Sequence, residues 1–87
     1  MTWTINFTEE ADKQLQSLDK PIRERIRKYV KELEKLPNPK LRAETLKGNL
    51  SEFCKYRVGD YRLICKIEDD KLLILVVKIG HRSKIYK

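Results

Sequence analysis

The stretch "CKYRVGDYRLIC", residues 54–65, constrains the fold more than any other part of this sequence. Two alternating runs flank Gly59-Asp60, a pattern that predicts a β-hairpin closed by a two-residue turn. Such a turn fixes the register, so residues equally distant from it face each other across the strands. Arg57 then faces Arg62, and like charges placed directly opposite each other destabilise a strand pair.

The same register sorts the hairpin into two faces. One face carries Phe53, Ile64 and four cations with almost no acid among them; the cations are called the outer patch below: Lys55, Arg57, Arg62 and Lys66. Two guanidiniums offer planar forks that match phosphate oxygens, and surrounding positive charge favours the neutral, proton-accepting form of a lysine. The outer patch therefore predicts an anion site that can support phosphoryl chemistry without a metal.

The other face of the hairpin is mostly apolar and is expected to lie under the helices as the core face. Its members are Cys54, Tyr56, Val58, Tyr61, Leu63, Cys65 and Ile67. The two cysteines face each other on this side, and in a reducing compartment they are expected to be buried thiols rather than a disulfide. A zinc site would need more ligands than these two thiols, so no metal or cofactor is expected.

The N-terminal half predicts one strand followed by two helices. Alternation over residues 2–7 indicates a half-buried strand, and Thr8 can cap a helix over residues 9–18. A second helix begins near Pro21 and ends at "PNPK", where two prolines prevent continuation. Its apolar residues form one stripe: Ile22, Ile26, Tyr29, Val30, Leu33 and Leu36.

Residues 40–51 predict a polar connector with one helical turn, followed by strands at 52–58, 61–67 and 72–79. The last run, "LLILVVKI", is apolar on both faces, so it is expected inside the sheet, with Gly80 at its end. The order β-α-α-β-β-β predicts an α+β fold. We expect a single domain over residues 1–87, in which a small, twisted, antiparallel-rich sheet carries an N-terminal helical hairpin on one face.

Charge and composition bound the function. A net charge of +7 favours a polyanionic partner, and 40% hydrophobic with 38% charged residues indicates a folded chain rather than a disordered one. No apolar run approaches the roughly 18 residues of a membrane span, and the start lacks a signal-peptide pattern. We therefore expect a cytoplasmic protein.

The C-terminal stretch "KIGHRSKIYK" gathers further candidate residues. Arg82 and Lys84 add cations, and Tyr86 offers a ring on which a base can stack. His81 has an ordinary pKa near neutrality and can exchange protons, although a structural role for it stays open.

Several of these features together resemble the RelE branch of the RelE/ParE toxin superfamily. They are the element order, "LKG" ahead of the strands, the "YRVGDYRLICKI" hairpin and the closing "GHRSKIY". The resemblance implies the toxin of a type II toxin–antitoxin system, bound by a RelB-like antitoxin in a hetero-oligomer. Such toxins are ribosome-dependent, metal-independent endoribonucleases that cut mRNA in the ribosomal A site and inhibit translation.

Carried over by position, the resemblance puts the catalytic residues on Lys55, Arg57, Arg62, Arg82 and Tyr86. Lys66 and Lys84 would bind RNA. Arg57 stands where a lysine is common in the family, and an arginine is a poor base because it stays protonated. Lys55 is therefore the expected acceptor of the 2′-hydroxyl proton, with His81 as the next candidate.

Two other functions stay open on the sequence. A ParE-like toxin would inhibit DNA gyrase by binding, and a non-catalytic module would use the same cations only to hold RNA. Ribosome-dependent cleavage of mRNA separates the three.

Overall fold

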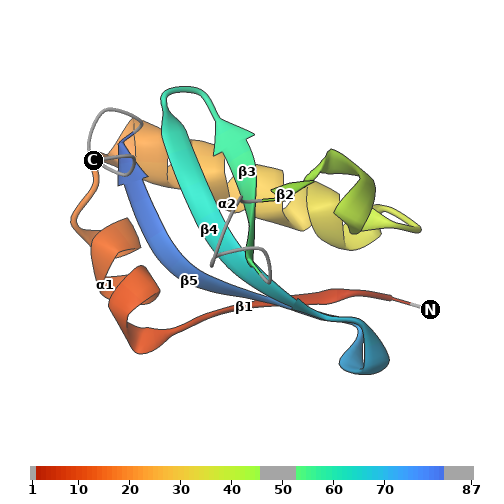
Figure 1. Cartoon of the computed structure of the whole chain (residues 1–87). Helices are drawn as coiled ribbons and strands as arrows, with labels where there is room; N and C mark the ends of the chain where they lie inside the picture. The colour runs from red at the N-terminus through yellow and green to blue at the C-terminus, as the bar shows by residue number, and fades with distance from the viewer. Residues whose placement is uncertain (1, 46–52, 82–87) are drawn as a thin grey trace.

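A computed structural model describes residues 2–45 and 53–81 of the chain (Figure 1). The elements follow in the order β1 (Thr4–Phe7), α1 (Glu9–Gln16), α2 (Lys20–Lys35), a 3₁₀ turn (Pro39–Arg42), β2 (Glu44–Thr45), β3 (Phe53–Val58), β4 (Tyr61–Glu68), a second 3₁₀ turn (Asp69–Lys71) and β5 (Leu73–His81). Apart from the short β2, this is the β-α-α-β-β-β order predicted from the sequence. Neither helix of the described segments is long and apolar enough to cross a membrane.

The five strands form one mixed sheet in the order β1-β5-β4-β3-β2. β1 runs parallel to β5, and the other neighbours pair in antiparallel fashion. β5 therefore lies inside the sheet, as its apolar sequence predicts. The helices lie against one face of this sheet (Figure 1). The buried core between them is formed by Ala11, Leu15, Ile26, Val30 and Leu33 from the helices and Tyr56, Leu63, Cys65, Ile74 and Val76 from the strands, among others.

The β3–β4 hairpin has the register that a two-residue turn dictates. Arg57 faces Arg62 and Cys54 faces Cys65. Gly59 has a φ of 60°, whereas Asp60 does not have a positive φ. A positive φ at the first central residue alone defines a type II′ turn, which suits glycine at that position.

Helix α1 begins as predicted and then fixes the edge of β5. The Thr8 side chain accepts a hydrogen bond of 3.1 Å from the Ala11 N–H, which is the expected N-cap. Beyond the end of β1, the N–H of Ile79 donates to Gln14 Oε1 at 2.7 Å. Near the C-terminal end of β5, where β1 no longer pairs with it, a helix side chain thus accepts the hydrogen bond that a neighbouring strand would otherwise accept.

Two element ends and one additional strand differ from what was expected. Helix α1 ends at Gln16 rather than at residue 18, because the Ser17 hydroxyl donates to the Gln14 carbonyl at 2.7 Å and closes the last turn. β5 does not end before Gly80 but continues to His81, which pairs with Tyr61. The predicted connector contains the strand β2, whose two residues are too few for an alternating pattern to reveal.

Candidate functional site

The outer patch lies on the face of the sheet opposite the helices, with the predicted pairing. Arg57 faces Arg62 and Lys66 faces Phe53 on β3, while β5 places Gly80 beside Arg62. Gly80 has no side chain, so β5 places no side chain of its own beside Arg62 at this pair. The hairpin therefore holds two arginines side by side in a fixed register.

Sequence reasoning missed one cation of this face. Lys78 is exposed on β5 and pairs with Ile64, which in turn pairs with Lys55 on β3. Extending the pairing from β4 to β5 would have found it, but the register between these strands shifts between Ile64 and Cys65. This β-bulge lies between Lys78 and the turn that joins β4 to β5, so counting residues from that turn would give Lys78 the wrong partner.

Arg62 is buried, although it lies on the face opposite the core. It is 4% exposed, whereas Arg57 is exposed. Its Nη1 donates to the Tyr61 carbonyl at 3.1 Å and more weakly to the Gly59 carbonyl at 3.5 Å. Its Nε is buried without a hydrogen-bond partner, and no carboxylate forms an ion pair with it within the described segments. A buried charge held only by carbonyls is costly to the fold.

Lys55 has an acidic neighbour that the sequence did not predict. Its Nζ lies 3.5 Å from Oε2 of Glu44, and its side chain is 20% exposed. Glu44 belongs to β2, which pairs with β3 at Lys55. The prediction of a patch almost free of acid was therefore wrong at this end, because the strand that carries the carboxylate was not recognised.

His81 comes beside the hairpin but not onto the outer patch. Its ring meets the ring of Tyr61 edge to face, with centroids 5.4 Å apart. Tyr61 and Arg62 are adjacent along a strand, so their side chains point to opposite faces. His81 shares the face of Tyr61, and the structure does not bring its imidazole together with Arg57 and Arg62.

Several predicted residues lie outside the described residues. They are Arg82, Lys84 and Tyr86 of the C-terminal stretch, together with the "LKG" segment at 46–48. Their roles stay predictions.

The paired cysteines are buried thiols, as expected. Both are free, and burial raises the pKa of Cys54 to about 11 and that of Cys65 further. Both therefore stay protonated near neutral pH and are poor nucleophiles. In the described part of the chain, no group of three or more His, Cys, Asp or Glu side chains is placed to hold a metal ion.

Comparison with known proteins identifies the family of this chain. Residues 5–86 match the family described as the ParE toxin of type II toxin–antitoxin systems. The mRNA interferase toxin RelE of Escherichia coli is 32% identical over 89 residues, which cover 99% of this chain and 92% of that protein.

Solved structures agree with the fold. The toxin–antitoxin complex RelBE2 of Mycobacterium tuberculosis contains a similar chain, with a TM-score of 0.84 and 24% identity, covering 97% of this chain and 95% of that one. The archaeal RelE–RelB complex of Pyrococcus horikoshii matches with a TM-score of 0.75 and 27% identity, covering 97% and 99%. The chain therefore belongs to the RelE/ParE toxin superfamily of type II toxin–antitoxin systems.

Proposed function

We propose that this toxin is a ribosome-dependent endoribonuclease that cuts mRNA in the A site and thereby stops translation. The observation that carries the proposal is Arg62, a buried guanidinium without a counter-ion in the described residues, held opposite a second arginine. Burying Arg62 in such a pair costs folding free energy, but the two guanidiniums can both donate hydrogen bonds to a phosphate. The E. coli relative named an mRNA interferase supports RNA as the substrate.

In the proposed reaction, the 2′-hydroxyl of the RNA attacks the adjacent phosphorus in line. A bond forms between O2′ and phosphorus while the bond to the 5′-oxygen of the next nucleotide breaks, leaving a cyclic phosphate and a free 5′-hydroxyl. Neither a metal nor a covalent enzyme intermediate takes part. The protein therefore has to position the RNA, accept the proton of the 2′-hydroxyl, let the departing 5′-oxygen take up a proton from the protein or from water, and stabilise the charge of the transition state.

Lys55 accepts or relays the proton of the 2′-hydroxyl, and the Glu44 carboxylate 3.5 Å from its Nζ orients it. Arg62, together with Arg82, stabilises the charge that develops on the phosphorane. Arg57 holds the flanking phosphate, and Tyr86 stacks on the base beside the cut. Because Arg62 is 4% exposed, RNA must displace the groups that cover it before contact.

His81 is the weaker candidate for the acid or base, since its ring packs against Tyr61 on the other face. Cleavage rates of Lys55→Ala and His81→Ala across pH assign the role. The residue whose loss leaves the rate and its pH profile unchanged does not move the proton.

The test of the whole proposal is mRNA cleavage on ribosomes. Removing one donor that stabilises developing charge typically costs about 10² to 10³ in rate, so Arg62→Ala should cut that much more slowly. Lys35→Ala, an exposed cation at the end of α2, is the matched control and should cut at the wild-type rate. Normal cleavage by Arg62→Ala would refute the assignment.

The proposed partner is a RelB-like antitoxin, as in the complexes of similar fold from P. horikoshii and Methanococcus jannaschii. With a net charge of +7, the toxin should bind an antitoxin through an acidic segment. The ribosomal substrate places the action in the cytoplasm. A protein that leaves mRNA intact but inhibits gyrase would instead act like ParE, and one that binds RNA without either effect would be a binding module.

A further inference from the structure

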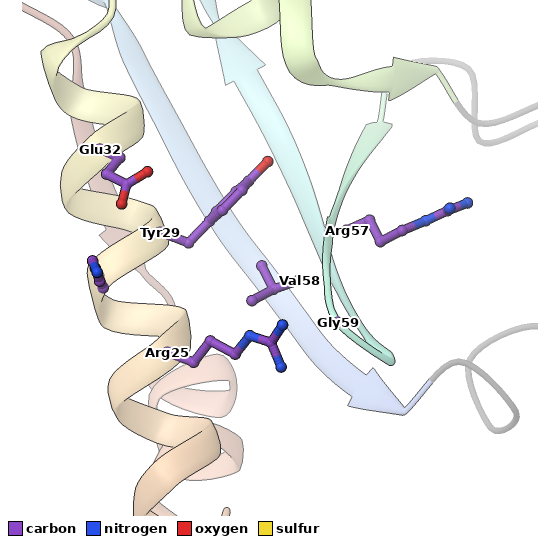
Figure 2. Close-up of a pocket in the computed structure, with 7 residues that line it drawn as sticks. Arg25, Tyr29, Glu32, Arg57, Val58 and Gly59 are labelled. Carbon is purple, nitrogen blue, oxygen red and sulfur yellow. The ribbon is translucent and has the colours of Figure 1, made fainter.

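A second cationic site lies across β3 from the outer patch. A pocket of about 300 Å³ lies between α2 and the turn that joins β3 to β4. Its lining residues are drawn in Figure 2. Arg25, Lys28, Tyr29 and Glu32 line it from the helix, and residues 57–59 line it from the strand. This volume is at the lower end of the range for small-molecule sites, so it suits a group the size of one nucleotide.

The two cations of this pocket come from one face of α2. Arg25 Nη1 lies 3.1 Å from the position that a Cβ of Gly59 would take, so the guanidinium packs on the bare backbone of the turn. Lys28 follows one helical turn along. Neither forms an ion pair with a carboxylate of the described residues. The pocket thus has two cations against the single carboxylate of Glu32.

Tyr29 forms the aromatic wall. Its ring meets the buried ring of Tyr56 edge to face, with centroids 6.2 Å apart, which fixes its orientation. Burial raises the pKa of its hydroxyl, although the positive charge of Arg42 acts in the opposite direction. The hydroxyl is therefore protonated at neutral pH, and the fixed ring presents an aromatic surface to the pocket.

The strand β3 supplies a backbone donor. β2 pairs with Cys54 and Lys55, so Arg57 lies beyond the paired part of this edge. In a two-residue hairpin, Arg57 and Arg62 form a non-hydrogen-bonded pair, so the Arg57 N–H points away from β4 toward the open edge. Its side chain points away from α2 (Figure 2). One residue thus contributes its amide to the pocket side and its guanidinium to the outer patch.

We propose that this pocket binds an RNA phosphodiester and its nucleotide, one strand away from the phosphate that is cut. Arg25 and Lys28 bind the phosphate oxygens with the Arg57 N–H, and the base lies against Tyr29. The inference rests on the proposed function, in which RNA binds the outer patch on the other side of β3. A nucleotide also supplies base amino groups as donors for Glu32, whereas an acidic peptide brings mainly further carboxylates to it.

The test is RNA binding by the double variant Arg25→Ala/Lys28→Ala. Its matched control is Arg27→Ala/Lys31→Ala, which removes two exposed cations from α2 residues that do not line the pocket. One probe is a labelled RNA oligonucleotide with 2′-O-methyl riboses, which cannot be cut by 2′-hydroxyl attack. The other probe is vacant ribosomes, which contain rRNA but no mRNA. Comparing the two probes therefore shows whether the bound phosphate belongs to mRNA or to rRNA.

The pocket variant should bind at least one probe about tenfold more weakly than the control, and its log–log salt slope should fall by about 0.7 for the one phosphate no longer neutralised. Weakening on the oligonucleotide assigns the phosphate to mRNA, and weakening on ribosomes alone assigns it to rRNA. Equal affinities of the two variants for both probes overturn the proposal, as does a loss limited to acidic-peptide binding. Since neither probe requires cleavage, an inactive wild type that still shows the difference would refute the proposed function and not the pocket.

Discussion

Replacing Arg62 by methionine should stabilise the fold while slowing RNA cleavage by about 10² to 10³. The side chain is 4% exposed, and within residues 2–45 and 53–81 it makes one good hydrogen bond, 3.1 Å to the Tyr61 carbonyl. Burial of an ion costs several kcal/mol, and a hydrogen bond to a charged group returns about 1.5–3 kcal/mol. Methionine fills a similar volume without a charge, and replacing buried ions by apolar residues typically gains about 1–4 kcal/mol.

The predicted gain is measurable by thermal and urea unfolding. Each kcal/mol shifts the Tm of a domain of this size by about 4–8 °C, so the Tm of Arg62→Met should rise by at least about 4 °C. Arg57→Met is the control, because this exposed side chain should change stability by no more than about 0.5 kcal/mol. A lower Tm for Arg62→Met would mean that the guanidinium supports the fold, and the argument from an uncompensated charge would be wrong.

Three further predictions concern the scaffold and can be checked by urea unfolding. Tyr56→Phe should cost about 1–2 kcal/mol, because the buried hydroxyl donates to the Pro39 carbonyl at 3.0 Å; an unchanged midpoint would show that this bond does not hold the connector. Gln14→Leu should cost about 1–3 kcal/mol by leaving the Ile79 N–H without its acceptor, and stability equal to wild type would contradict that role. Burial raises the pKa of the Cys54 thiol to about 11, so the free energy of unfolding should keep the full contribution of this thiol below about pH 8.5 and lose it toward pH 11, where only the unfolded chain loses the proton. Cys54→Ala should lose less stability over this range, and parallel curves of unfolding free energy against pH for the two proteins would refute the assignment.

The parts of the fold that local chemistry determines could be predicted from the sequence. The turn at Gly59-Asp60 set the β3–β4 register, and the apolar run of β5 placed this strand inside the sheet. What could not be predicted depends on contacts between distant segments. β2 has two residues and exists through its pairing with β3, so neither it nor the carboxylate beside Lys55 leaves a periodic signal.

The face of a side chain was predictable, but its burial was not. Alternation along β4 puts Arg62 on the face opposite Leu63 regardless of what covers that face. Burial depends on what packs over the strand, which alternation does not encode. His81 shows the same limit. Its place near the hairpin could be predicted from the strand order. The face that it occupies could not, because it depends on the pairing of β4 with β5 continuing past Gly80 to Tyr61 and His81.

The short turn has a consequence for both cationic sites. Gly59 lies between two arginines, with Arg25 packed on its backbone from the helix side and its carbonyl accepting a weak bond from Arg62 at 3.5 Å. A longer loop would relax the register that keeps Arg57 opposite Arg62 and would remove the bare backbone on which Arg25 rests. The repulsion between the two facing arginines is therefore maintained by the hairpin geometry itself. The two-residue turn fixes the register that pairs Arg57 with Arg62. It also fixes the pocket and the outer patch on opposite sides of β3.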